Sequence, residues 1–239
     1  MHAPQLVERI RGGDRRALAR AITLVENGSG ELREIMAGLA PYTGRSRVVG
    51  LTGSPGVGKS TTTNAVVRAA RARGLTVAVL AVDPSSPFTG GALLGDRVRM
   101  QEHATDAGVF IRSMANRGHL GGLSWATPHA LRVLDAAGFD MILVETMGVG
   151  QAEVDIAGQA DTTVVLCAPG MGDSVQAAKA GVLEIADVFA LNKADRDGAR
   201  ATLRELRQMV AMKDRGDREW KPPIVMTVAS EGEGIDELW

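Results

Sequence analysis

The chain has 239 residues, 45% of them apolar, and a formal net charge of −1, so it is long and apolar enough to bury the core of one α/β domain. The near-neutral charge without a basic stripe argues against a nucleic-acid-binding surface, and no apolar run reaches the roughly 20 residues that span a bilayer. The N-terminus lacks the apolar core of a secretory signal and Cys167 is the only cysteine, which together predict a cytoplasmic protein without an intramolecular disulfide.

Residues 1–46 have a helical pattern and contain no catalytic motif. Asp14 is a candidate N-cap for a helix whose apolar side chains recur at helical spacing, at Ala17, Leu18, Ala21, Ile22 and Val25. A glycine-containing break at residues 27–30 separates this helix from a second one, predicted from Glu31 to Leu39. We therefore expect a small helical N-terminal extension packed on the main domain.

Residues 47–239 alternate short apolar runs with amphipathic segments. Strands are predicted at residues 48–52, 76–82, 109–112, 141–145, 162–168, 188–192 and 224–228. Helices are predicted at residues 61–73, 127–137, 175–183 and 199–212. This alternation predicts an α/β domain with a mostly parallel central sheet and helices on both faces.

The glycine-rich stretch after the first strand contains a complete Gly-x-x-x-x-Gly-Lys-Ser motif, the phosphate-binding loop of P-loop NTPases. Glycines let the backbone N–H groups approach phosphate oxygens, and the start of the following helix adds partial positive charge. Lys59 is expected to reach the β- and γ-phosphates, and the Ser60 hydroxyl is expected to bind Mg²⁺. The predicted phosphate-binding residues are Gly53, Ser54, Pro55, Gly56, Val57, Gly58, Lys59, Ser60 and Thr61.

A second motif, Asn192-Lys193-Ala194-Asp195, follows the predicted strand at residues 188–192 and fits the guanine-reading pattern Asn-Lys-x-Asp. Guanine presents two adjacent donors, N1–H and the N2 amino group, and an ionised Asp195 can accept from both. Adenine has no proton on N1, so a site of this kind favours GTP and GDP over adenine nucleotides. Lys193 is expected along the base, and Asn192 is expected to tie this loop to the phosphate loop.

Polar residues follow directly after several predicted strands, as they do where parallel strands end at a ligand site. Glu145 ends the strand at 141–145 and is expected to help to hold Mg²⁺, acting through water. Asp83 follows the strand at 76–82, and Asp96 lies in the glycine-rich run 89–96; both are further candidates to hold Mg²⁺ or position water. A turn or helix-capping role is the alternative for each of these two aspartates.

The combination of motifs resembles the MeaB/ArgK-type family of methylmalonyl-CoA mutase-associated GTPases. The residues that carry the resemblance are LTGSPGVGKST (51–61), AVDPSSPFTGGALLGDRVRM (81–100), RGHLGGL (117–123), AAGFDMILVETMGVGQAEVDIA (136–157) and NKAD (192–195). The resemblance implies a GTPase that chaperones an adenosylcobalamin-dependent acyl-CoA mutase, gating cofactor loading and protecting the enzyme.

By position, the resemblance implies a guanine site completed by Val228, Ala229 and Ser230, and a metal site made of Ser60, Asp83, Asp96 and Glu145. It also implies that residues 169–181 form a switch loop that faces the mutase, although Ser174-Val175 departs from the Glu-Leu pair that is common in the family. Family members continue into a helical C-terminal arm that forms a dimer, so a homodimer is expected for a full-length form.

Three alternatives stay open at this point. A metallocentre-insertion GTPase usually carries clusters of histidine or cysteine, whereas this chain has four scattered histidines and one cysteine. A P-loop kinase needs no guanine motif, so the presence of residues 192–195 counts against that class. A partitioning-type ATPase carries a lysine at the position that Ser54 occupies in this chain.

The expected chemistry is in-line attack of water on the γ-phosphate, with Lys59, Asp83 and Glu145 as the candidate catalytic residues. The sequence offers no obvious glutamine or arginine finger to position the water or stabilise its attack. Slow intrinsic turnover is therefore expected.

Overall fold

The computed structural model describes residues 2–84, 100–103, 105–116, 125–146, 155–170, 183–212 and 220–239. Its helices are α1 (Ala3–Arg11), α2 (Arg15–Glu26), α3 (Leu32–Leu39), α4 (Lys59–Ala72), α6 (Thr127–Ala136), α9 (Leu183–Ile185), α10 (Ala199–Met212) and α11 (Ile235–Leu238), with 3₁₀ turns η1 (Ala40–Tyr42), η2 (Gln101–His103) and η3 (Ile156–Gly158). The strands are β1 (Arg47–Thr52), β2 (Val77–Pro84), β3 (Val109–Asn116), β4 (Met141–Glu145), β5 (Thr162–Cys167), β6 (Val188–Asn192) and β7 (Ile224–Thr227).

All seven predicted strands are present, and they form a sheet in the order β3-β2-β4-β1-β5-β6-β7. The pairs β2–β3, β1–β5, β5–β6 and β6–β7 are all parallel. The α/β fold with a mostly parallel sheet is thus confirmed. The predicted helix at 175–183, the glycine-rich run at 89–96 and the RGHLGGL stretch at 117–123 fall largely or wholly outside the described residues.

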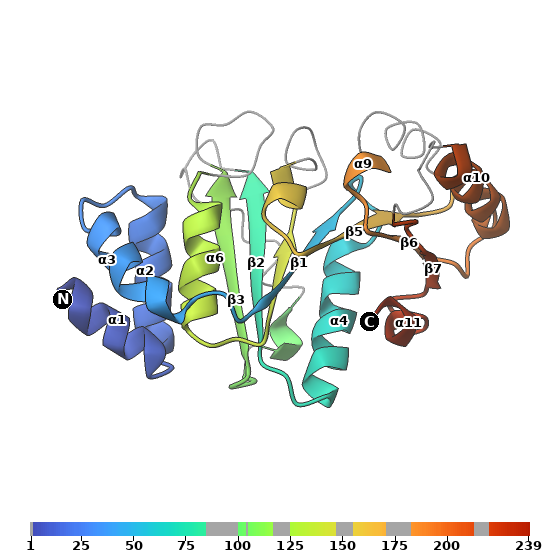
Figure 1. Cartoon of the computed structure of the whole chain (residues 1–239). Helices are drawn as coiled ribbons and strands as arrows, with labels where there is room; N and C mark the ends of the chain where they lie inside the picture. The colour runs from blue at the N-terminus through green and yellow to red at the C-terminus, as the bar shows by residue number, and fades with distance from the viewer. Residues whose placement is uncertain are drawn as a thin grey trace. The chain divides into compact units, whose positions relative to one another are not determined.

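The chain divides into two compact units, and the first comprises residues 1–48, 70–119 and 123–144. Helices α1, α2 and α3 cluster beside α6 in this unit (Figure 1). The predicted cap is confirmed, since the Asp14 carboxylate accepts from the N–H groups of Arg16 and Ala17 at the start of α2. Helix α1 was expected only as part of a general helical pattern. It is a separate helix because Gly12 and Gly13 break the chain before Asp14.

A largely buried ion pair links α2 to strand β3 in the first unit. Arg112 Nη2 donates to Glu26 Oε2 at 2.9 Å, and the two side chains are 20% and 9% exposed. The same guanidinium nitrogen donates to the Thr23 hydroxyl at 3.0 Å. The helical segment is therefore attached to the sheet by specific polar contacts as well as by its apolar face.

The connection into β1 is held by Asp135 of α6. Its carboxylate accepts from the backbone N–H groups of Gly44, Arg45 and Ser46. Burial of this carboxyl opposes ionisation, but the N–H donors outweigh it and hold the pKa of Asp135 below its usual value.

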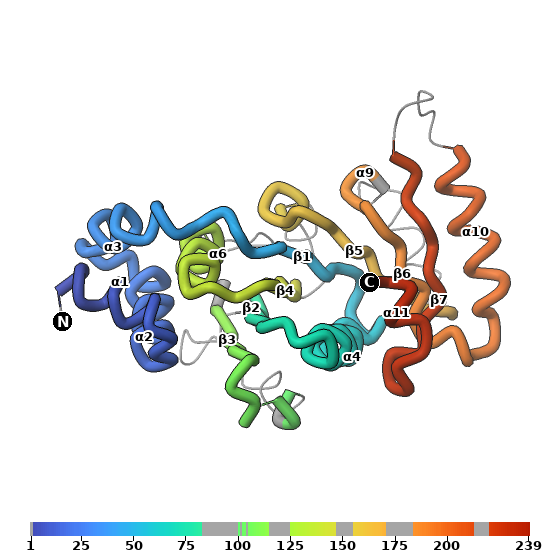
Figure 2. Tube along the Cα trace, turned by 60° about the horizontal axis from the view of Figure 1, so that its bottom comes forward, coloured from blue at the N-terminus to red at the C-terminus, as the bar shows by residue number. Residues whose placement is uncertain are grey.

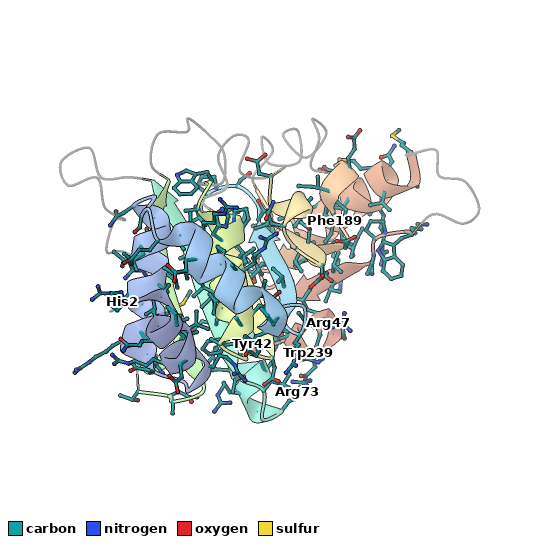
Figure 3. The ribbon with its side chains drawn as sticks, turned by 60° about the vertical axis from the view of Figure 1, so that its left-hand side comes forward. His2, Tyr42, Arg47, Arg73, Phe189 and Trp239 are labelled. Carbon is teal, nitrogen blue, oxygen red and sulfur yellow. The ribbon has the colours of Figure 1, made fainter. Side chains whose placement is uncertain are left out.

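A cation–π contact joins α1 to η1: the Arg11 guanidinium lies 3.7 Å from the ring centroid of Tyr42, which is labelled in Figure 3.

The second unit comprises residues 49–69, 120–122 and 145–239. In Figure 2, α10 runs beside β6 and β7, and its apolar residues pack with those of the strands. This core contains Val165, Cys167, Ala186, Phe189, Leu191, Leu206, Met209 and Val210. Phe189, labelled in Figure 3, is fully buried. Burial raises the pKa of the Cys167 thiol to about 12, which suits a small core residue and not a nucleophile.

No helix within the described ranges combines the length and the apolar character that crossing a membrane demands.

Candidate functional site

The phosphate loop lies between the end of β1 at Thr52 and the start of α4 at Lys59. The two glycines of its motif, Gly53 and Gly58, cannot be replaced by another residue without a steric clash. Gly53 has φ = 138°, and a Cβ there would stand 2.3 Å from the carbonyl oxygen of Leu166 in β5. Gly58 has φ = 100°, and a Cβ there would stand 2.3 Å from Asn192 Nδ2. Both positions therefore need glycine for backbone conformation and for close approach.

Lys59 lies within the curve of this loop. Its ammonium group donates to the carbonyl oxygens of Gly53 at 2.7 Å and Ser54 at 3.1 Å, and the residue is only 8% exposed. A cation held inside a turn of glycine-rich backbone at a helix start is suited to binding phosphate.

Glu145 and Ser60 meet at the end of β4. Ser60 Oγ donates to Glu145 Oε1 at 2.6 Å, and the glutamate is 5% exposed. Thr63 Oγ1 lies 3.1 Å from the other carboxylate oxygen, Oε2. Hydroxyl and carboxylate oxygens are hard donors of the kind that Mg²⁺ prefers, so this pair fits that ion with water completing its shell.

The two predicted aspartates are less fully described. Asp83 lies near the end of β2, but its side chain falls outside the described part, and Asp96 lies wholly outside it. Ser60 and Glu145 are thus the two predicted metal-site residues that the described structure brings together. Among the residues described, no group of three or more His, Cys, Asp or Glu side chains is arranged so that it could hold a metal ion.

Asn192 joins three segments at the end of β6. Its Nδ2 donates to the carbonyl oxygen of Val57 in the phosphate loop at 2.9 Å. Its Oδ1 accepts from the Thr227 hydroxyl at 3.2 Å and from the backbone N–H of Ala229 at 3.1 Å. Asn192 as a whole is 3% exposed, so this link is shielded from water.

Lys193 has a left-handed backbone, with φ = 59°, and its ammonium group donates to the carbonyl oxygen of Gly56 at 2.6 Å. The side chain therefore extends from the Asn-Lys-x-Asp loop to the phosphate loop. Asp195 and Ser230 are exposed, whereas Val228 and Ala229 are buried. An exposed carboxylate beside an ordered lysine can accept hydrogen bonds from an incoming base.

Comparison with known families agrees with this geometry. Residues 18–239 match the family model described as methylmalonyl Co-A mutase-associated GTPase MeaB. The chain belongs to this MeaB family.

Relatives of this MeaB-family chain include proteins of Pyrococcus abyssi, Escherichia coli and Mus musculus. A protein of Pyrococcus abyssi is 57% identical over 237 residues, covering 98% of this chain and 73% of its own length. GTPase ArgK of Escherichia coli is 40% identical over 240 residues, covering 98% of this chain and 72% of the relative. The mitochondrial methylmalonic aciduria type A homolog of Mus musculus is 38% identical over 247 residues, covering 95% of this chain and 59% of the relative.

Solved structures share the fold. The crystal structure described as LAO/AO transport system kinase superposes with a TM-score of 0.78 at 31% identity, covering 99% of this chain and 72% of that one. HypB from Helicobacter pylori, solved in complex with nickel, gives a TM-score of 0.59 at 16% identity and covers 87% of this chain and 89% of that one, a likeness of fold alone.

Two site residues of this MeaB-family chain, Thr63 and Thr227, did not emerge from the sequence motifs. Thr63 lies three residues after Ser60, a spacing that places both on one face of α4. This spacing could have indicated from the sequence that Thr63 lies near the same site as Ser60. Thr227 ends β7 immediately before the predicted Val228-Ala229-Ser230 segment. The role of its hydroxyl depends on the position of Asn192 and has no local signature.

Proposed function

We propose that this chain binds GTP with Mg²⁺ and hydrolyses it to GDP and phosphate. The observation that carries the proposal is the set of hydrogen bonds made by Asn192, which joins a phosphate-binding loop to a guanine-reading loop. A nucleotide whose phosphates lie on the first loop then has its base beside the second. Family membership supports the same activity.

Guanine recognition is assigned to Asp195, with Lys193 along the base and Val228, Ala229 and Ser230 completing the pocket. Because Asp195 is exposed and follows a loop fixed by Asn192 and Lys193, its carboxylate is available to accept from N1–H and the N2 amino group. A base without those donors leaves the carboxylate unpaired, which is the basis of selection.

Phosphate binding is assigned to residues 53–61, with Lys59 neutralising charge on the β- and γ-phosphates. Ser60 and Glu145 are assigned to the metal, joined by Asp83 and Asp96 as in the resemblance. Bound Mg²⁺ supplies charge neutralisation between the phosphates. The Lys59 ammonium and the backbone N–H groups stabilise the charge that develops as water attacks the γ-phosphate in line.

The proposed client is an adenosylcobalamin-dependent acyl-CoA mutase of the methylmalonyl-CoA type, for which the protein acts as a chaperone in cofactor loading and protection. The description of the family as mutase-associated supports this client. The proposed contact loop, residues 169–181, lies mostly outside the described residues. A cytoplasmic location and the homodimer that the resemblance implies belong to the same proposal.

The test is the rate of GTP hydrolysis by the purified protein, alone and with an adenosylcobalamin-dependent acyl-CoA mutase, with ATP as the control nucleotide. A slow rate with GTP only, raised by the mutase, supports both the nucleotide and the client. If GTP alone is hydrolysed and the mutase does not change the rate, the nucleotide assignment is supported and the proposed client is contradicted. Equal rates with ATP and GTP contradict the guanine assignment.

A further inference from the structure

The carboxylate of Glu145 has a hydroxyl partner on each of its two oxygens, and both partners come from α4. Ser60 contacts Oε1 at 2.6 Å and Thr63 contacts Oε2 at 3.1 Å. All three residues are buried: Ser60 is 8% exposed, Thr63 0% and Glu145 5%. Only the Ser60 contact follows from the phosphate-loop motif.

A carboxylate bonded at one oxygen can still rotate about its last side-chain bond, because that torsion has a broad energy profile. A second donor on the other oxygen fixes the plane of the group and therefore the direction in which Oε1 faces. Removing that donor takes away one of the contacts that orient the buried carboxylate, which favours its reorientation.

We propose that Thr63 is a positioning residue for the magnesium site: its hydroxyl holds Glu145 Oε2 so that Oε1 stays directed at the Ser60 hydroxyl, the group with which it would hold Mg²⁺. The inference rests on the proposed function, because it concerns the metal of the same nucleotide site. Partners that orient metal-site carboxylates typically affect metal affinity by about 10- to 100-fold.

Thr63 has a competing, purely structural contact, since its Oγ1 lies 3.0 Å from the carbonyl oxygen of Lys59, one helical turn back. Such back-bonds are common for threonine inside helices and need no function. An ionised carboxylate is the stronger acceptor for the single hydroxyl proton, which favours the contact with Glu145. The experiment must separate these two roles.

The neighbouring residue provides a matched control. Thr62 is also 0% exposed and lies on the same helix, but its hydroxyl oxygen has no hydrogen-bond partner among the described residues. One residue along a helix is a rotation of about 100°, so Thr62 does not share the face of Ser60 and Thr63. Thr62→Val removes a buried hydroxyl without touching Glu145.

The test measures the affinity of fluorescently labelled GDP while Mg²⁺ is titrated, a binding readout that requires no hydrolysis. For Thr63→Val, the half-saturating Mg²⁺ concentration should rise by about 10-fold, while the affinity for GDP in EDTA stays at the wild-type value. Thr63→Ser should restore the wild-type Mg²⁺ dependence because it returns the hydroxyl. Thr62→Val should match the wild type.

An unchanged Mg²⁺ dependence in Thr63→Val, or an equal shift in Thr62→Val, overturns the positioning role. Binding of GDP in EDTA reports that each variant is folded, and Thr63→Ala replaces Thr63→Val if the valine variant does not fold. In the background of Glu145→Gln, Thr63→Val should add no further shift, since the group through which it acts has been altered. A wild-type protein with no Mg²⁺-dependent GDP binding contradicts the proposed function instead.

Discussion

The carboxamide nitrogen of Asn192 donates to the carbonyl oxygen of Val57 at 2.9 Å, joining residues 135 positions apart in the sequence. The same carboxamide accepts from the N–H of Ala229 and the hydroxyl of Thr227. One buried side chain therefore sets the separation between the phosphate loop and the loops proposed to hold the base.

Replacement of Asn192 by alanine is expected to lower both stability and nucleotide affinity. The change leaves the buried carbonyl of Val57 and the N–H of Ala229 without their partner, at a cost of about 1–3 kcal/mol in the free energy of unfolding. Thermal unfolding and GDP titration measure the two effects. Thr227→Val, which removes one donor to Oδ1 and keeps the bond to Val57, should have the smaller effect on GDP affinity. Equal affinities in all three proteins would falsify this coupling.

Asp195→Asn should change the preferred base. The asparagine amide can donate to a carbonyl, so it accommodates the C2 carbonyl of xanthine in place of the N2 amino group of guanine. We expect weaker GTP binding, stronger XTP binding and little change in thermal stability, because Asp195 is exposed. Competition of GTP, XTP and ATP against labelled GDP checks the result. A variant that keeps the wild-type order of these nucleotides contradicts the role of Asp195.

Lys59→Ala should abolish tight nucleotide binding. The ammonium group is held at the phosphate loop by the carbonyls of Gly53 and Ser54, and its hydrogen bonds to charged phosphate oxygens are each worth about 1.5–3 kcal/mol. Loss of two such bonds lowers GTP affinity by roughly 100-fold or more. Calorimetric titration with GTP measures the loss. The exposed Lys221→Ala provides a control, and equal affinities in the two variants would remove Lys59 from the site.

The sequence predicted those features that depend on near neighbours. Asp14 and the N–H groups of Arg16 and Ala17 lie within three positions, so the cap could be recognised locally. The strands were recognisable for the same reason, because their apolar runs are continuous. The phosphate loop and the guanine motif were visible as short, fixed spacings.

Contacts across the fold were not predictable in this way. Thr63 and Glu145 lie 82 positions apart, and their hydrogen bond depends on a helix face meeting the end of a strand. The Asp135 carboxylate likewise accepts from backbone N–H groups of residues 44–46, which lie about 90 positions away in the sequence. A backbone N–H group is present in almost every residue, so the donor side of these bonds has no sequence motif. Such contacts require side-chain directions that periodicity does not specify.

Asp135→Asn should destabilise the protein at neutral pH, and the difference should shrink as the pH falls below about 4. Because N–H donors depress the folded-state pKa of Asp135, its ionised form contributes stability above the unfolded pKa of about 3.8. That contribution is lost as the pH falls through the lower folded-state value. Melting temperatures of both proteins between pH 7 and pH 3 check the sign, with exposed Asp197→Asn as control. A difference that persists unchanged in acid contradicts the assignment.

The ion pair between Glu26 and Arg112 should behave as a coupled unit. Glu26→Leu leaves the guanidinium beside an apolar side chain, and we expect a loss of about 1–3 kcal/mol, less than for a fully buried pair because Arg112 is 20% exposed. The double variant Glu26→Leu, Arg112→Met should recover part of that loss, since neither charge then remains unpaired.

Denaturant unfolding of the single and double variants measures this coupling, and exposed Glu8→Leu on α1 is the control for adding an apolar side chain. Additive losses in the double variant would show that the two charges act independently. GDP affinity should stay unchanged throughout, because the residues proposed to bind the base and phosphates, Asp195 and Lys59 among them, lie in the other compact unit. A loss of GDP affinity that follows the loss of stability would instead indicate that α2 supports the nucleotide site.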